Sequence, residues 1–132
     1  MDRNQLRQKI RGTIVTLPTA FDNEMKLDLG RMIDMTHWWI EQGLGGETAP
    51  LKTSAAMGEG PDLNDDEWPD LLETVVKAAG SNANIICGLK PKDTQNTIED
   101  AKRAQDMGAI GLQIDLPFFH HPNQEVPGLL DG

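Results

Sequence analysis

The sequence predicts an α/β fold in which helices cover a parallel β-sheet. Short apolar runs typical of strands alternate with amphipathic helical segments along the 132 residues. The runs have no polar face, as expected for parallel strands that are buried on both sides. Two architectures fit this order: an open doubly wound sheet, or half of a (β/α)₈ barrel, whose complete form takes about 250 residues.

The first part of the chain predicts a peripheral helix, a strand and a long helix. Residues 2–10 form a short polar segment outside the core, and the β-branched run 13–17 predicts the first strand. Asp28 can cap the helix that follows, because apolar residues recur after it at three- and four-residue spacing as far as Leu44. Glycines at 43, 45 and 46 then end the helix.

The second strand has the weakest signal in the sequence. It contains little β-branching and follows Pro50, so we expect pairing only over about 51–55. Asn64 and Glu67 form a capping-box pattern, with the helix expected to start near Asp66. The helix carries an apolar stripe of Trp68, Leu71, Leu72, Val75, Val76 and Ala79, and Gly80 ends it.

The last predicted strands are 84–88 and 109–115. Between them, Asp93 or Thr94 can cap a third long helix. This helix is expected to turn four apolar residues inward: Ile98, Ala101, Ala104 and Met107. Residues 116–132 are rich in proline and glycine without a period, which predicts a loop or frayed tail.

Composition limits the classes of function. A net charge of −9 argues against nucleic acid or an anionic membrane surface as a partner, because both need a basic face. The amino terminus has no apolar signal region, and no run is long enough to span a bilayer, so we expect a cytoplasmic protein. The single cysteine, Cys87, lies in an apolar stretch and is interpreted as a core residue.

Four segments, in order, are similar to a known family. They are Gly12–Phe21 (GTIVTLPTAF), Ala55–Glu59 (AAMGE), Ile86–Gly88 (ICG) and Pro117–Glu125 (PFFHHPNQE). Over about residues 11–125 the chain resembles the dihydrodipicolinate synthase/N-acetylneuraminate lyase family of class I aldolases. The resemblance implies a parallel (β/α)-barrel of TIM type, here a truncated half barrel of about four strands and three main helices. We expect one partial domain over 1–132.

The resemblance also implies a chemistry. Members of the family are lyases or aldolases that act on pyruvate or a related 2-oxo acid through a lysine Schiff base. The imine itself acts as the electron sink, so no cofactor is implied. The expected partner is the small 2-oxo acid, and the full-length protein is expected to be a homo-oligomer.

The family's motifs point to candidate site residues. By resemblance, the backbone N–H groups of Ala56, Met57 and Gly58 bind the substrate carboxylate, although the family's hydroxyl side chains are absent here. Phe118 and Phe119 correspond to the family's tyrosine pair and cannot pass a proton. The Schiff-base lysine belongs to the sixth strand, so we expect no catalytic residue in this chain and a fragment that is inactive alone.

Other readings of the sequence remain. Lys90 follows a strand, but its surroundings predict a solvated loop rather than a buried, reactive amine. His120 and His121 are interpreted as loop residues, and no metal site is expected, because no third ligand has a fixed spacing. The alternative function is a non-catalytic four-strand α/β module that binds a small anion or a partner protein.

Overall fold

The structure, a computed structural model, describes residues 1–115. Four strands form one parallel sheet whose spatial order follows the chain. They are β1 (Val15–Thr16), β2 (Leu51–Thr53), β3 (Ile85–Leu89) and β4 (Gly111–Ile114). The predicted loop or tail over 116–132 lies outside the described residues and stays a prediction.

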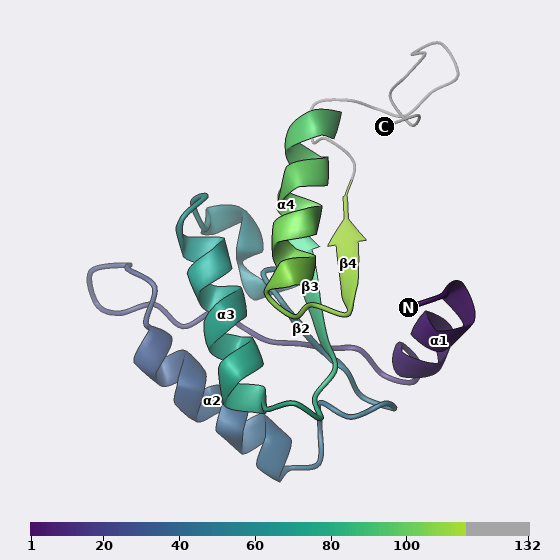
Figure 1. Cartoon of the computed structure of the whole chain (residues 1–132). Helices are drawn as coiled ribbons and strands as arrows, with labels where there is room; N and C mark the ends of the chain where they lie inside the picture. The colour runs from purple at the N-terminus through teal and green to yellow at the C-terminus, as the bar shows by residue number, and fades with distance from the viewer. Residues whose placement is uncertain (116–132) are drawn as a thin grey trace.

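The helices decide between the two architectures. They are α1 (Arg3–Lys9), α2 (Leu29–Glu41), α3 (Glu67–Ala79) and α4 (Thr94–Asp106). Figure 1 shows α2, α3 and α4 together on one side of the sheet. A doubly wound sheet carries helices on both faces and reverses its strand order at a switch point. Sequential strands with one helix-covered face form a partial (β/α)-barrel instead, as the family resemblance implies.

Local capping fixes where the long helices begin. The side chains of Asp28 and Asp93 each accept a hydrogen bond from the backbone N–H three residues further on, at 2.9 Å. Asn64 accepts from the N–H of Glu67 at 2.9 Å, and the Glu67 carboxylate accepts from the N–H of Asn64 at 2.9 Å. These contacts satisfy N–H groups that lack a partner within the helix. The predicted caps at Asp28 and Asp93 are confirmed. The hydrogen bonds of the Asn64–Glu67 capping box also form, but the residue directly before α3 is Asp66, whose side chain makes no capping bond.

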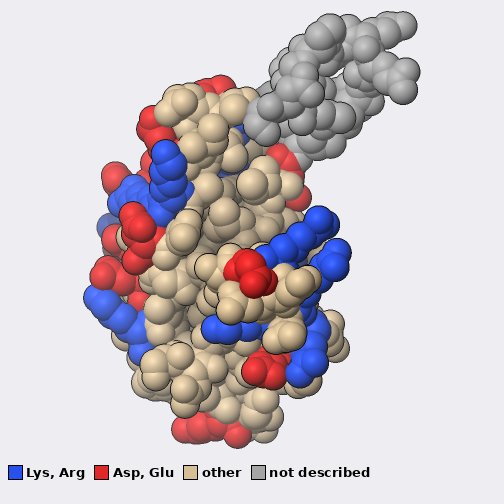
Figure 2. Space-filling model, turned by 45° about the vertical axis from the view of Figure 1, so that its right-hand side comes forward, with Lys and Arg blue, Asp and Glu red and all other residues tan. Residues whose placement is uncertain are grey.

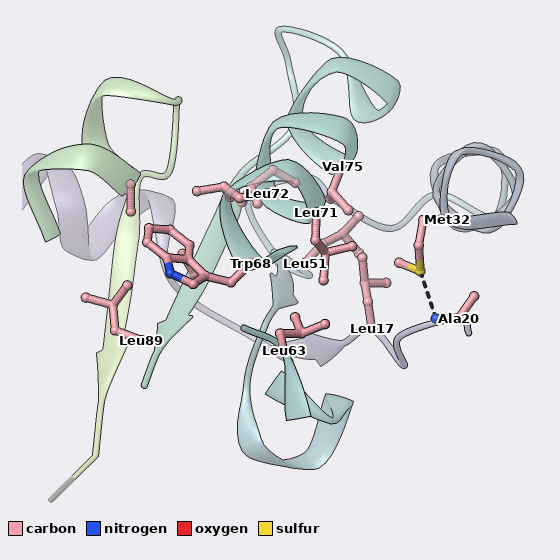
Figure 3. Close-up of a cluster of buried hydrophobic side chains, with 13 residues drawn as sticks. Leu17, Ala20, Met32, Leu51, Leu63, Trp68, Leu71, Leu72, Val75 and Leu89 are labelled. Atoms are coloured by element: carbon pink, nitrogen blue, oxygen red, sulfur yellow. Dashed lines mark hydrogen bonds between the residues drawn. The ribbon is translucent and has the colours of Figure 1, made fainter. Parts of the chain in front are cut away.

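The hydrophobic core lies between the sheet and the helices (Figure 3). Alternate residues of β2 and β3 face α3, because successive side chains of a strand point to opposite faces. The buried cluster includes Leu17, Met32, Leu51, Leu63, Trp68, Leu71, Leu72, Val75, Cys87 and Leu89. The stripe predicted for α3 is therefore confirmed, with Trp68, Leu71, Leu72 and Val75 all buried.

The opposite face of the sheet is the face that lines the interior of a barrel, here called the luminal face. It carries the residues between those of the core, including Thr16, Lys52, Ile86, Gly88 and Gln113. Near the amino ends of the strands, α1 lies against it. The Asn84 side chain donates to the carbonyl oxygen of Lys9 at 3.3 Å.

Ile10, just after α1, lies over β4. A side chain at Gly111 would overlap with the tip of Ile10, so the glycine leaves the space that Ile10 fills. No residue of α1 is buried, which confirms a polar helix outside the core. The segment around Ile10 nevertheless closes the amino end of the luminal face.

Two expectations about burial are wrong. Ile98 was expected to face the core but is 41% exposed, since α4 turns Ala104 rather than Ile98 toward the sheet. In β4, Leu112 and Ile114 lie on the helix-covered side yet are 37% and 59% exposed. Within residues 1–115, no helix follows β4 to cover them, so β4 is apolar on this face without being buried.

The surface agrees with an acidic, globular chain. Figure 2 shows charged side chains of both signs, mostly around the margins of the visible face, and uncharged side chains through much of its middle. None of the helices in the described part of the chain has the length and apolar character needed to cross a bilayer.

Leu72→Ala is expected to lower the free energy of unfolding by about 2–5 kcal/mol, because it leaves a cavity between α3 and the sheet. Urea denaturation followed by circular dichroism measures the change. Leu112→Ala is the matched control, because this side chain lies on the same side of the sheet but is 37% exposed, and the expected loss is below about 1 kcal/mol. Equal losses for the two variants would contradict the burial of Leu72 beneath α3.

Candidate functional site

The predicted carboxylate-binding segment follows β2 as two short 3₁₀ turns, η1 (Ala56–Gly58) and η2 (Gly60–Asp62). Ser54 and Glu59, which flank η1, have left-handed backbone conformations, with φ of 58° and 62°. Such angles are uncommon for residues other than glycine. The two residues turn the chain sharply, so the segment folds back at the carboxyl end of the sheet, where barrels of this type place their active sites.

Three glycines let this segment lie against neighbouring backbone. A Cβ atom at Gly58 would overlap with the carbonyl oxygen of Leu17, and one at Gly60 with that of Ser54. A Cβ atom at Gly88 would lie 2.7 Å from the Cα of Ala55. Real Cβ atoms do not approach backbone so closely, so any larger residue would push the segment away from β1 and β3.

Hydrogen bonds hold the segment in the same place. The Thr19 hydroxyl donates to the carbonyl oxygen of Gly58. The N–H groups of Gly58 and Gly60 both donate to the carbonyl oxygen of Ala55, each at 2.9 Å. The loop after β1 and the turn after β2 are therefore joined.

Two backbone donors of the segment have no acceptor among the residues that the structure describes. The N–H of Gly58 is already bonded to Ala55, but those of Ala56 and Met57 have no acceptor within residues 1–115. Both residues are exposed, and the Met57 side chain is 90% exposed, so it does not cover the donors. Adjacent backbone N–H groups of this kind can bind a carboxylate or another small anion. Of the three predicted residues, Gly58 instead provides room for close packing.

Lys90 differs from its prediction. Its ammonium group donates to the carbonyl oxygen of Leu63 at 2.7 Å and is partly buried, rather than lying in a solvated loop. Because Lys90 directly follows β3 and Leu63 follows η2, this bond fastens the end of the segment to the sheet. The amine is thus engaged with a backbone carbonyl.

Lys92, two residues further on, forms ion pairs with Asp65 at 2.8 Å and Asp100 at 2.7 Å. Its ammonium group holds the pKa of Asp65 below the usual range. This cation is therefore matched by two carboxylates and has a structural role between α3 and α4.

Sequence reasoning missed Lys52. It lies on β2 between the buried residues Leu51 and Thr53, and its side chain lies on the luminal face. Its Nζ donates to Gln113 Oε1 at 2.7 Å, and Gln113 Nε2 donates to Asp115 Oδ1 at 3.1 Å. The available signal was a single charge inside a strand that is otherwise suited to burial.

Cys87 is confirmed as a core residue. Burial, together with the nearby Asp100 carboxylate, raises the pKa of its thiol to about 12. The thiol therefore stays protonated near neutral pH and is a poor nucleophile.

Other candidates from the sequence lie outside the described residues: Phe118, Phe119, His120 and His121. Among residues 1–115, no group of three or more metal-ligating side chains lies together. A pocket of about 500 Å³ lies between α1 and the segment 108–112 at the start of β4. That is the amino end of the strands, so the pocket is separate from the free N–H groups of Ala56 and Met57.

Comparison with known proteins gives a consistent result. The sequence matches the Dihydrodipicolinate synthetase family over residues 9–129. The 4-hydroxy-tetrahydrodipicolinate synthase of Prochlorococcus marinus (strain NATL2A) is 33% identical over 112 residues, which are 85% of this chain and 36% of the relative. The chain therefore spans a little over a third of the length of the relatives it matches.

Solved structures show the same relationship. The chloride-inhibited dihydrodipicolinate synthase from Acinetobacter baumannii, in complex with pyruvate, has a TM-score of 0.79 and 28% identity. The match covers 91% of this chain and 39% of that one. A monomeric dihydrodipicolinate synthase variant has a TM-score of 0.77 and 27% identity, over 93% of this chain and 39% of its own.

Gly58→Ala is expected to displace η1 and lower the melting temperature, because the new methyl group meets the Leu17 carbonyl oxygen. Gly46→Ala is the matched control, since a Cβ there meets no atom within 4 Å. Thermal unfolding and amide hydrogen exchange at residues 56–60 measure the effect. Similar behaviour of the two variants would contradict the close packing of η1 on β1.

The Cys87 thiol is expected to resist modification by a disulfide reagent at pH 8, because it is buried and its pKa is raised to about 12. Denaturation should restore rapid reaction, as the thiol returns to its ordinary value of 9.0. Absorbance of the released thiol follows the reaction. Rapid modification of the folded chain would show that the core around Cys87 opens.

Proposed function

This chain belongs to the dihydrodipicolinate synthetase family, and we propose that it supplies the carboxylate-binding part of a lyase that acts on pyruvate or a related 2-oxo acid. The observation that carries the proposal is the pair of N–H groups at the exposed residues Ala56 and Met57, which have no acceptor within residues 1–115 and follow the carboxyl end of β2. A relative with the same fold is known in complex with pyruvate.

In this proposal the substrate carboxylate accepts hydrogen bonds from both N–H groups. Hydrogen bonds to an ionised acceptor are shorter and about twice as strong as neutral ones. They also use backbone alone, so the site tolerates Ala56 and Met57 where the family carries hydroxyl side chains. The packing of Gly58 and the Thr19 hydroxyl keep the two donors in place before substrate arrives.

The bond-breaking chemistry needs a lysine amine. The amine adds to the 2-oxo carbon, water leaves, and the protonated imine accepts the electron pair when an adjacent bond breaks or a proton is removed. We propose that this lysine lies in a part of the full-length protein beyond these 132 residues. Lys90 is not a substitute, because its ammonium group is bonded to the Leu63 carbonyl oxygen. The 132 residues therefore bind without catalysing.

The same proposal extends to assembly and location. We propose a homo-oligomer for the full-length protein, in the cytoplasm. One relative is a monomeric variant, so sedimentation of the full-length protein decides between one subunit and several.

Titration of the ¹⁵N-labelled chain with pyruvate tests the binding proposal. The amide signals of Ala56 and Met57 are expected to shift in a saturable manner, and those of exposed α1 to stay in place. Acetone, which keeps the carbonyl group but lacks the carboxylate, is the control ligand and should cause no shift. Equal responses to the two compounds would sink the proposed carboxylate site.

Borohydride reduction with labelled pyruvate tests the chemical part. No covalent adduct is expected on the 132-residue chain, as judged by intact-mass measurement. A stable adduct at Lys90 would overturn the assignment of Lys90 to a structural role. Saturable binding of acetate as tight as that of pyruvate, with no adduct, would favour the alternative of a non-catalytic anion-binding module.

A further inference from the structure

We propose that Lys52 supplies the positive charge of the 2-oxo-acid site and pairs with the substrate carboxylate held by Ala56 and Met57. The inference rests on the proposed function, because it adds a residue to the same site. Lys52 lies on β2, an inner strand of the sheet. In this proposal its amine attracts the substrate carboxylate by its charge and forms no covalent bond.

The Lys52 side chain lies on the luminal face of the sheet. Leu51 and Thr53, on either side of Lys52, are 0% and 1% exposed and face the helices. Lys52 is only partly buried and lies on the luminal face between β1 and β3. A lysine on an inner strand is costly unless its charge has a use or a partner, because burial disfavours the charged form.

The Lys52 ammonium group reaches across the luminal face to the side chain of Gln113. Lys52 itself is level with Ile86 of β3, but its Nζ lies 2.7 Å from Oε1 of Gln113, which is level with Gly88. The two side chains therefore meet on the luminal face. Gly88 has no side chain there, and its luminal side is approached by the backbone of Ala55, the residue that precedes Ala56 and Met57. The ammonium group and the start of the candidate anion-binding segment thus lie on the same face of the sheet.

The positive charge of Lys52 is not balanced by a carboxylate in the described part of the chain. Lys52 forms no ion pair within residues 1–115, whereas the partly buried Lys92 is matched by two carboxylates. Asp115 accepts from the Gln113 amide, which turns the amide oxygen toward Lys52. An ammonium group has three donors, and Gln113 takes one of them. Among residues 1–115, two donors and the positive charge remain for an anion.

Gln113 then has a definite role as a positioning residue. Its amide lies between the Lys52 ammonium group and the Asp115 carboxylate, so the two opposite charges are kept apart. A carboxylate in direct contact with Lys52 would neutralise the charge that we assign to substrate binding.

Pyruvate titration of ¹⁵N-labelled variants tests the inference, with the Ala56 and Met57 amide shifts as the readout. Lys52→Met is expected to raise the dissociation constant for pyruvate about tenfold, the size expected for loss of a charge-assisted contact. Lys52→Arg keeps the charge and should stay within about threefold of the wild type. Lys77→Met, which removes an exposed lysine paired with Glu73 on α3, is the control and should bind as the wild type does.

The salt dependence of pyruvate binding distinguishes loss of the Lys52 charge from a loss of folding stability in the variant. Added sodium chloride should weaken pyruvate binding to the wild type more than to Lys52→Met, because salt screens the proposed ion pair. Gln113→Glu retains Lys52 but places a carboxylate against it, and should weaken binding as Lys52→Met does. This variant also decides the question if Lys52→Met does not fold.

The outcomes distinguish the two proposals. If the wild type binds pyruvate at Ala56 and Met57 and both Lys52→Met and Gln113→Glu bind equally well, the role of Lys52 is wrong while the carboxylate site stands. If the wild type gives no response at Ala56 and Met57, both proposals fail. Borohydride trapping of labelled pyruvate on Lys52 would also overturn the inference, since it assigns a non-covalent role.

Discussion

The segment after β2 packs so closely that its backbone contacts other backbone directly. A Cβ atom at Gly58, Gly60 or Gly88 would overlap with the neighbouring backbone atoms. This close approach sets the position of every group in the candidate site. It allows Ser54 and Glu59 to turn the chain, leaves the N–H groups of residues 56 and 57 without an acceptor within residues 1–115, and keeps the luminal side of β3 free of a side chain at Gly88. The identities of the nearby side chains matter less, which is consistent with Ala-Met in place of hydroxyl residues.

Features set by neighbouring residues were predictable from the sequence. The caps at Asp28, Asn64 and Asp93 depend on a side chain and an N–H two or three residues away, so their spacing is visible in the sequence. The order of the elements was predictable for the same reason. Their exact lengths were not: the strand expected over 13–17 is regular only at Val15 and Thr16, because pairing depends on what lies beside it.

The features that were missed depend on contacts between distant parts of the chain. The residues next to Lys90 in the sequence are mostly polar, which predicts a solvated loop. Its structural role comes from the hydrogen bond to the Leu63 carbonyl oxygen, 27 residues away in the chain. Lys52 acquires its role from Gln113, 61 residues away, and from the absence of a side chain at Gly88. The exposure of Leu112 and Ile114 likewise follows from what covers β4, and a strand sequence does not carry that information.

The contact between Ile10 and Gly111 joins the first turn of the chain to its fourth strand. A ribosome makes proteins from the amino end, so Ile10 leaves the exit tunnel about a hundred residues before its partner. The Asn84 contact with the Lys9 carbonyl can hold the first helix once the chain has reached β3, but Ile10 meets its partner only after Gly111 has been added. The amino end of the luminal face is therefore completed only when β4 has been made.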